Sequence, residues 1–187
     1  YFMAVLQHWA QAGIPVAKPV CTRNRQVLSV LNGKPAALLT RLAGTHPEQP
    51  TVAECAQMGE VLARMHVAGE TFPLKRPPDR GHDWRMQTAE HVLPHLDSED
   101  AALLKREMAF QQTLTLDQLP SGTIHADLFR DNALLVDGKL SGVLDVYFAC
   151  TDSLLYDLAV LVNDWCGQAD GALQTDKLEA CIGAYQA

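Results

Sequence analysis

The sequence is poor in basic residues and has no long apolar run. Its 187 residues include 15 Lys and Arg against 22 Asp and Glu, which gives a formal net charge of -7. Nucleic acids and anionic membrane surfaces both attract basic patches, so we expect neither nucleic acid nor a membrane as a partner. No apolar stretch approaches the roughly 20 residues that a membrane-spanning helix requires.

Cysteine is also sparse, and its spacing shows no metal-binding or disulfide pattern. There are 5 cysteines, an odd number, without a CxxC pair. We therefore expect reduced thiols, mostly buried, in a cytoplasmic protein without a structural zinc or disulfide framework. His91 and His95 have the spacing of a helical zinc site, but Pro94 interrupts the helix between them.

The sequence does contain helical and strand patterns, in a length that suits one domain or two small lobes. Helical spacing of apolar residues predicts helices over residues 1–12, 51–69, 84–93, 98–116, 154–166 and 176–186. Strands are expected over residues 26–31, 35–42, 123–125, 133–136 and 139–145, with tight turns at Asn32-Gly33 and Asp137-Gly138. Thr51 and Glu54 form a capping box at the start of the second helix. Trp84 and Trp165 are expected to anchor the core.

Aspartates are concentrated in the later strand-and-loop region, where only Arg130 and Lys139 offset them. Seven of them lie on or near these loops: Asp127, Asp131, Asp137, Asp145, Asp152, Asp157 and Asp164. Bringing so many carboxylates together is costly unless a cation joins them. Some have simpler explanations, because Asp137 belongs in its turn, Asp152 is expected to cap a helix, and Asp131 is expected to be solvated.

His125, Asp127 and Asn132 follow the spacing His-x-Asp-x-x-x-x-Asn, the catalytic-loop pattern of protein-kinase-like phosphotransferases. The pattern also requires a short hairpin and then a second metal-binding aspartate, and Asp145 stands at that place. In this chemistry one carboxylate orients or deprotonates the attacking hydroxyl. An asparagine oxygen and the second carboxylate hold Mg²⁺ against the phosphate, and such hard oxygen ligands suit that ion.

Longer stretches of the sequence resemble one group within these enzymes. IHADLFRDNALLV (124–136) and GVLDVYFACTDSLLYDLAVLVNDWC (142–166) closely resemble the homoserine kinases of the aminoglycoside/choline phosphotransferase superfamily. The segments LNGKPAALLTRLAG (31–44), GEVLARMHVAG (59–69) and GHDWRM (81–86) are also similar to that family. The resemblance therefore covers the whole chain.

This resemblance implies an α+β, protein-kinase-like fold with a truncated N-terminal lobe and a mainly helical C-terminal lobe. Residues 1–42 would form the partial N-terminal lobe, a helix and a hairpin up to the hinge. Residues 43–187 would form the C-terminal catalytic lobe, incomplete at its C-terminus. The implied activity is ATP- and Mg²⁺-dependent phosphorylation of the L-homoserine hydroxyl to O-phospho-L-homoserine, in threonine biosynthesis.

The resemblance also assigns roles by position around the catalytic loop. Asp127 becomes the catalytic base or hydroxyl-orienting group, and Asn132 and Asp145 become the Mg²⁺ ligands. Asp157 resembles an aspartate that holds the catalytic loop in place. His125 would brace the same loop, although a buried, hydrogen-bonded histidine without further function explains it equally well.

Binding roles are implied for five further residues. The adenine of ATP would meet backbone groups near Thr40, Arg41 and Leu42 at the hinge. An amino-acid ammonium could pair with Asp164, unless that residue is only a helix-surface carboxylate. Arg130 could bind phosphate or a substrate carboxylate, or it could simply pair with a neighbouring aspartate.

The sequence departs from the kinase pattern in two ways. Val146-Tyr147 follow Asp145 in place of Phe-Gly, so switching through a Phe flip is not implied. No glycine-rich phosphate loop precedes the hinge, and Lys18 and Lys34 do not occupy the place of the phosphate-binding lysine. We therefore expect a chain cut at both ends and inactive or weak by itself.

Two alternatives to homoserine phosphorylation stay open at the level of the sequence. One is a related small-molecule kinase that acts on an aminoglycoside or a choline-like amino alcohol. The other is a kinase-fold domain that binds a ligand without catalysis. The presence of Asp127, Asn132 and Asp145 together argues against the second alternative.

Overall fold

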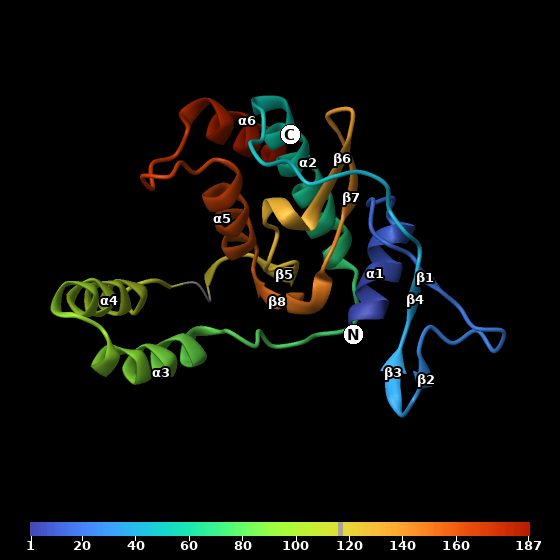
Figure 1. Ribbon diagram of the computed structural model, residues 1–187, viewed down its shortest axis with the longest axis horizontal. Helices are drawn as coiled ribbons and strands as arrows, with labels where there is room; N and C mark the ends of the chain where they lie inside the picture. The colour runs from blue at the N-terminus through green and yellow to red at the C-terminus, as the bar shows by residue number, and fades with distance from the viewer. Residues whose placement is uncertain (116–117) are drawn as a thin grey trace.

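A long helix, α2 (Val52–Glu70), runs through the middle of the molecule (Figure 1). The structure is a computed structural model that describes residues 1–115 and 118–187. The predicted capping box begins this helix, since the Thr51 hydroxyl accepts from the Glu54 N–H at 3.3 Å and the Glu54 carboxylate accepts from the Thr51 N–H at 2.7 Å. Each of these bonds satisfies a backbone donor that the first helical turn leaves free.

Three helices pack against α2 and build the core: α1 (Phe2–Gln11), α5 (Leu154–Trp165) and α6 (Thr175–Gln186). Their buried side chains form one hydrophobic cluster, in which Trp9 and Trp165 are almost fully enclosed. The Trp9 indole N–H donates to the Met65 carbonyl of α2 at 3.2 Å. Residues of α1 thus share their core with α2, and the expected lobe boundary at residue 42 stays a prediction.

The N-terminal strands are short and lie at the edge of the molecule (Figure 1). A hairpin of β2 (Ser29–Leu31) and β3 (Lys34–Ala36) turns at Asn32 and Gly33, both with positive φ as predicted. The expected strand over residues 35–42 is wrong in extent. It is broken into β3 and the two-residue β4 (Leu38–Leu39), which pairs with an unforeseen β1 (Pro19–Val20).

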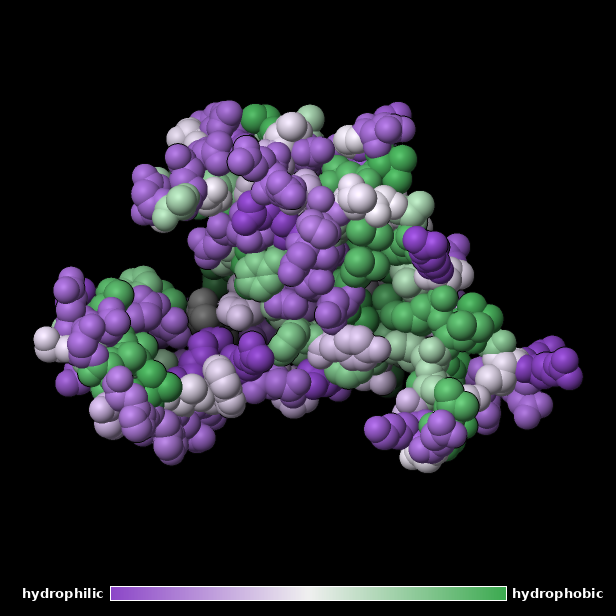
Figure 2. Space-filling model, in the orientation of Figure 1, coloured by the Kyte–Doolittle hydropathy of each residue, from purple (hydrophilic) through white to green (hydrophobic). Residues whose placement is uncertain are grey.

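Most residues of these short strands are exposed. Val30 is 76% exposed and Leu31 is 66% exposed, so the hairpin gains little from apolar burial. Figure 2 shows hydrophobic side chains at the surface in this region, to the right of and below the main body.

Two antiparallel ladders form the strand-and-loop region: β5 (Ser121–Ile124) with β8 (Cys150–Ser153), and β6 (Ala133–Val136) with β7 (Lys139–Val143). The last residue of β5 pairs with the first residue of β8, Ile124 with Cys150. The loop after β5 and the segment before β8 therefore leave the ladder at the same edge. This register brings the His125–Asn132 loop next to the segment that contains Asp145.

The β8 strand was not expected, and it corrects the reading of Asp152 as a helix cap. Asp152 lies within β8 opposite Gly122, and the residue at the N-cap of α5 is Ser153. The Asp152 carboxylate accepts a hydrogen bond from the Ser153 N–H at 2.7 Å.

Helices α3 (His82–Val92) and α4 (Ser98–Gln111) stand as a pair beside the main body (Figure 1). The N-cap of α4 is Asp97, whose carboxylate accepts from two backbone N–H groups, and the helix ends at Gln111. Its expected end at Leu116 lies outside the described residues. Trp84 is 46% exposed and does not anchor the core, whereas Trp165, at 1%, does so as expected.

All five cysteines are free in the structure, and every one except Cys21 is buried. Among the residues that the structure describes, no helix is both long enough and apolar enough to span a membrane.

Candidate active site

The loop between β5 and β6 carries Asp127 and is held in a strained conformation. Ala126 has a φ of 66°, in the left-handed region that costs a residue with a side chain about 1–3 kcal/mol. The neighbouring Leu128 is fully buried, and its carbonyl accepts from the Trp165 indole N–H at 3.1 Å. These anchors on both sides fix the half-buried Asp127 between them.

Asp157, in the first turn of α5, holds this loop in place through hydrogen bonds. Its two carboxylate oxygens accept from the backbone N–H groups of His125 at 2.7 Å and of Ala126 at 2.8 Å. A third bond comes from Nε2 of His66 at 3.1 Å. Burial raises the pKa of Asp157, but the hydrogen bond and charge of His66, followed by those of His125, outweigh it and leave the pKa below its ordinary value.

His125 is completely buried and connects the catalytic loop to the segment before Asp145. Its Nε2 donates to the Leu144 carbonyl at 2.8 Å, and its ring lies parallel to the Trp9 indole. This geometry fits both interpretations of His125, because a buried, hydrogen-bonded histidine at this place also braces the loop.

Asn132 lies across the loop from Asp127 and is oriented by it. The Asn132 Nδ2 group donates to the Asp127 carbonyl at 2.8 Å and to Asp127 Oδ2 at 3.2 Å. Both partners are acceptors only, so the amide must direct its NH₂ group toward them. The Asn132 Oδ1 atom consequently points away from these two acceptors, and it accepts no hydrogen bond from the described residues.

Asp145 follows β7 with a left-handed φ of 53°, and its side chain is exposed. Burial raises the pKa of Asp127. The charge of His125 opposes this effect, whereas the Asp145 carboxylate raises the pKa further. The Asp145 carboxylate therefore acts on Asp127 as a like charge, which a bound cation would offset.

The donor set at Asn132 and Asp145 fits Mg²⁺. It consists of one amide oxygen and one carboxylate, both hard ligands, beside the carboxylate of Asp127. Magnesium in nucleotide sites is commonly held by one or two carboxylates together with substrate phosphates. Within residues 1–115 and 118–187 no group of three or more His, Cys, Asp or Glu side chains could hold a metal by itself.

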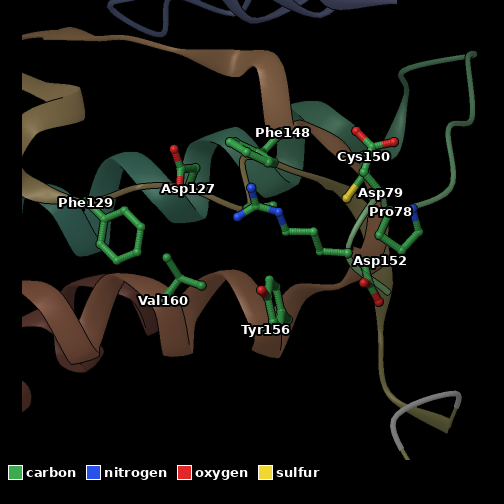
Figure 3. A pocket seen from close by; sticks show the side chains of 11 residues that line it. Pro78, Asp79, Asp127, Phe129, Phe148, Cys150, Asp152, Tyr156 and Val160 are labelled. Carbon is green, nitrogen blue, oxygen red and sulfur yellow. The ribbon is translucent and has the colours of Figure 1, made fainter. Parts of the chain in front are cut away.

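A cavity of about 140 Å³ opens beside Asp127 (Figure 3). Phe129 and Phe148 lie on the same side as Asp127, and Tyr156 and Val160 of α5 lie opposite. The cavity extends toward Asp152 of β8 and toward the segment before α3, which contributes Pro78, Asp79 and Arg80. A small acceptor placed here would meet the Asp127 carboxylate directly.

Comparison with known proteins places this arrangement in a family. The family model described as the phosphotransferase enzyme family matches residues 1–186 of the chain. The chain belongs to the phosphotransferase enzyme family. Its curated relatives include the homoserine kinase of Methylobacillus flagellatus, which is 46% identical over 186 residues, 100% of this chain and 58% of that protein.

Two further relatives of this phosphotransferase show the same pattern. The homoserine kinase of Janthinobacterium sp. is 40% identical over 99% of this chain and 59% of its own length. That of Neisseria meningitidis serogroup B is 41% identical over 100% of this chain and 61% of its own length. The predicted resemblance is thus confirmed, and the chain spans about three fifths of the length of the curated relatives it matches.

Solved structures confirm the predicted kinase-like α+β fold of this phosphotransferase. An amicoumacin kinase bound to AMP-PNP has a TM-score of 0.75 at 17% identity, covering 99% of this chain and 60% of that one. A spectinomycin phosphotransferase bound to ADP and spectinomycin has a TM-score of 0.73 at 13% identity, covering 100% of this chain and 63% of that one.

The hinge residues lie in the segment that follows β4. The Thr40 N–H donates to the Lys18 carbonyl at 2.9 Å, and the Thr40 hydroxyl accepts from the Lys18 N–H at 2.8 Å. Thr40 is thus tied to the neighbouring strand. In the described part of the chain, the backbone groups of Arg41 and Leu42 make no such bond, and the adenine-binding role of this segment stays a prediction.

Arg130 and Asp164 pair with each other rather than facing Asp127. The Arg130 Nε lies 3.1 Å from Asp164 Oδ2, and the Arg130 backbone N–H donates to the same oxygen at 2.6 Å. Another guanidinium nitrogen donates to the Glu48 carbonyl. Both residues line hollows near residues 46–50, outside the cavity that contains Asp127. A substrate role for either residue stays a prediction.

Sequence reasoning missed Arg80 and Asp152 as residues of the cavity, and it missed His66 as a partner of Asp157. Arg80 belongs to a proline-rich connection that shows no motif. The only signal for Asp152 was its position in the aspartate-rich region, where a capping role was expected instead.

Proposed function

We propose that this chain is the catalytic part of an ATP-dependent kinase that phosphorylates the side-chain hydroxyl of L-homoserine. The product would be O-phospho-L-homoserine, a step of threonine biosynthesis. One observation carries the choice of acceptor: relatives named homoserine kinase are 40–46% identical across the whole chain. The activity belongs to a protein of the length of those relatives.

Asp127 acts on the acceptor hydroxyl in this proposal. Its carboxylate accepts the hydroxyl hydrogen bond and takes the proton as the oxygen attacks the γ-phosphorus of ATP in line with the leaving ADP. Asp157 fixes the backbone before Asp127, and Asn132 fixes its carboxylate. The loop is thereby preorganised and needs little rearrangement during the reaction.

Asn132, through Oδ1, and Asp145 would hold Mg²⁺, which supplies charge neutralisation for the phosphate oxygens. The backbone groups of Arg41 and Leu42 would bind the adenine. The 187-residue chain alone is expected to be inactive or weak, because it contains no glycine-rich phosphate loop and no matching lysine.

The size of the cavity favours a small acceptor over an antibiotic. Sites for drug-sized ligands usually enclose at least about 300 Å³, more than the cavity beside Asp127 offers. The antibiotic kinases among the solved structures share only 13–17% identity with this chain, which supports the fold alone.

An acceptor panel with the full-length protein tests the proposal. ATP- and Mg²⁺-dependent ADP release is measured with L-homoserine, choline and an aminoglycoside, and without an acceptor. We expect kcat/KM for L-homoserine to exceed the other values by at least about 100-fold. A preference for choline or the aminoglycoside would show that the acceptor assignment is wrong.

A further inference from the structure

Apart from Asp127 itself, the cavity contains one positive and one negative side chain without an ionic partner among the described residues. The positive one is Arg80, and the negative one is Asp152. Asp79 also lines the cavity, but it already forms a salt bridge with Arg76. Among the described residues, neither Arg80 nor Asp152 takes part in any salt bridge.

Arg80 is held by aromatic rings rather than by a carboxylate. Its guanidinium carbon lies 4.6 Å from the centre of the Phe148 ring and 5.7 Å from that of Trp84. Its backbone carbonyl accepts from a guanidinium N–H of Arg85 at 3.1 Å. Stacking on a ring positions a guanidinium but leaves its edge, with the N–H donors, free to bind a carboxylate with two parallel hydrogen bonds.

Asp152 is held in place by the β5–β8 ladder. Its backbone pairs with Gly122, and one carboxylate oxygen accepts from the Ser153 N–H. The other oxygen has no hydrogen-bond donor within the described residues. Figure 3 shows Asp152 and Tyr156 on the side of the cavity opposite Asp127. A half-buried carboxylate with a free oxygen is suited to bind an ammonium group.

We propose that Arg80 and Asp152 form a subsite for the two charged groups of an α-amino acid. Arg80 binds the α-carboxylate and Asp152 binds the α-ammonium, so that the side-chain hydroxyl reaches Asp127. This inference rests on the proposed function and names the groups that select its acceptor. With this subsite the acceptor needs neither Arg130 nor Asp164, which form a salt bridge with each other outside the cavity.

The charges also exclude the alternative acceptors. Choline and aminoglycosides carry positive charge without a carboxylate, so they leave the Arg80 guanidinium without a partner. An unpaired or like charge at a binding site lowers affinity for the wrong ligand, which is how specificity arises.

The test combines protein variants with truncated acceptors in the full-length protein. Arg80→Met keeps an apolar stem over Phe148 but removes the charge, and 3-aminopropan-1-ol is an acceptor without the carboxylate. We expect Arg80→Met to lower kcat/KM for L-homoserine about 10- to 100-fold, chiefly through KM, and to change kcat/KM for 3-aminopropan-1-ol less than about 3-fold. Arg80→Lys should recover part of the loss because it keeps the charge.

Asp152→Asn is paired with 4-hydroxybutanoate, which lacks the ammonium group. We expect an equally large loss with L-homoserine and little change with 4-hydroxybutanoate. Where a truncated acceptor reacts too slowly, its inhibition constant against L-homoserine gives the same comparison. Arg106→Met, on the exposed face of α4, and Asp137→Asn, in the β6–β7 turn, are the matched controls and should leave kcat/KM unchanged.

The outcomes separate the two claims. If L-homoserine is phosphorylated but each variant loses the same factor with every acceptor, the subsite is overturned and the proposed function stands. Such uniform loss would place Arg80 on the phosphate or in a purely structural role. If the wild-type protein does not phosphorylate L-homoserine, the proposed function and the subsite are both overturned.

Discussion

At the scale of single residues, one buried carboxylate organises the catalytic loop. Asp157 accepts three hydrogen bonds, two of them from consecutive backbone groups next to Asp127. An ion in a protein interior is tolerated only when such bonds replace its hydration. The strained backbone of Ala126 persists because its N–H is one of these donors.

Replacing Asp157 with Asn should therefore destabilise the protein by about 3 kcal/mol, since an amide cannot accept from both loop N–H groups and His66. The pKa of Asp157 is depressed in the fold. The stability that its charge contributes is then fully present above pH 3.8, the ordinary pKa of the group. This stability is lost as the pH falls through the lower pKa of the folded state. Urea unfolding of the wild type and Asp157→Asn at several pH values measures this. A stability difference that does not shrink at acidic pH would contradict the assigned charge.

Asp145 offers a second test at this scale. Asp145→Asn removes the carboxylate next to Asp127 and should lower kcat at least about 100-fold, with more Mg²⁺ needed for half-maximal rate. Titration of kcat with Mg²⁺ measures both effects. Asp137→Asn is the control, because Asn suits the same turn. An unaltered Mg²⁺ dependence in Asp145→Asn would exclude Asp145 as a ligand.

The residues of the site differ in how visible they are in the sequence. Asp127 and Asn132 belong to one loop, so their spacing alone shows that the two side chains can meet. Arg80 and Asp152 come from distant segments, and no local pattern records that both line the cavity. Pairing of Arg130 with a neighbouring aspartate was one of the alternatives open at the level of the sequence, but its partner, Asp164, depends on how α5 lies against the loop of Asp127.

At the scale of elements, the β5–β8 register positions the site. Pairing of Ile124 with Cys150 brings the loop of Asp127 and the segment of Asp145 to one edge. The sequence could not predict β8, because a four-residue strand without apolar alternation is defined mainly by its distant partner. Helix α2 was predictable since its capping box is local.

The crossing of α2 and α6 requires a residue without a side chain. A Cβ atom at Gly59 would lie 2.1 Å from the Cys181 carbonyl oxygen, which belongs to the backbone and cannot move aside alone. We expect Gly59→Ala to destabilise the protein by about 2–3 kcal/mol. Gly183→Ala is the matched control on exposed α6, where nothing lies within 4 Å.

The control should stabilise the protein by up to about 1 kcal/mol, because alanine favours helix over glycine. Thermal or urea unfolding of both variants measures the contrast. Equal stability of Gly59→Ala and Gly183→Ala would show that α2 and α6 are not in close contact.

At the scale of the whole molecule, the acidic balance is compatible with the proposed activity. A net charge of -7 disfavours polyanions in general. Seven of the acidic residues lie between His125 and Asp164 in the sequence, and Mg²⁺ at Asn132 and Asp145 would offset part of this charge and admit the phosphates of one nucleotide. The cavity is lined by residues of the catalytic loop, of α5 and of the segment that leads to the α3–α4 pair.

Direct observation of the phosphorylated product tests the central claim. The full-length protein is incubated with ATP, Mg²⁺ and L-homoserine, and phosphorus NMR follows the phosphate groups. The wild type should convert ATP to ADP and O-phospho-L-homoserine in equal amounts, and Asp127→Asn should slow this conversion about 10²- to 10⁴-fold while Asp137→Asn does not. Absence of the phosphate ester with the wild type, or its formation at the wild-type rate by Asp127→Asn, would contradict the account.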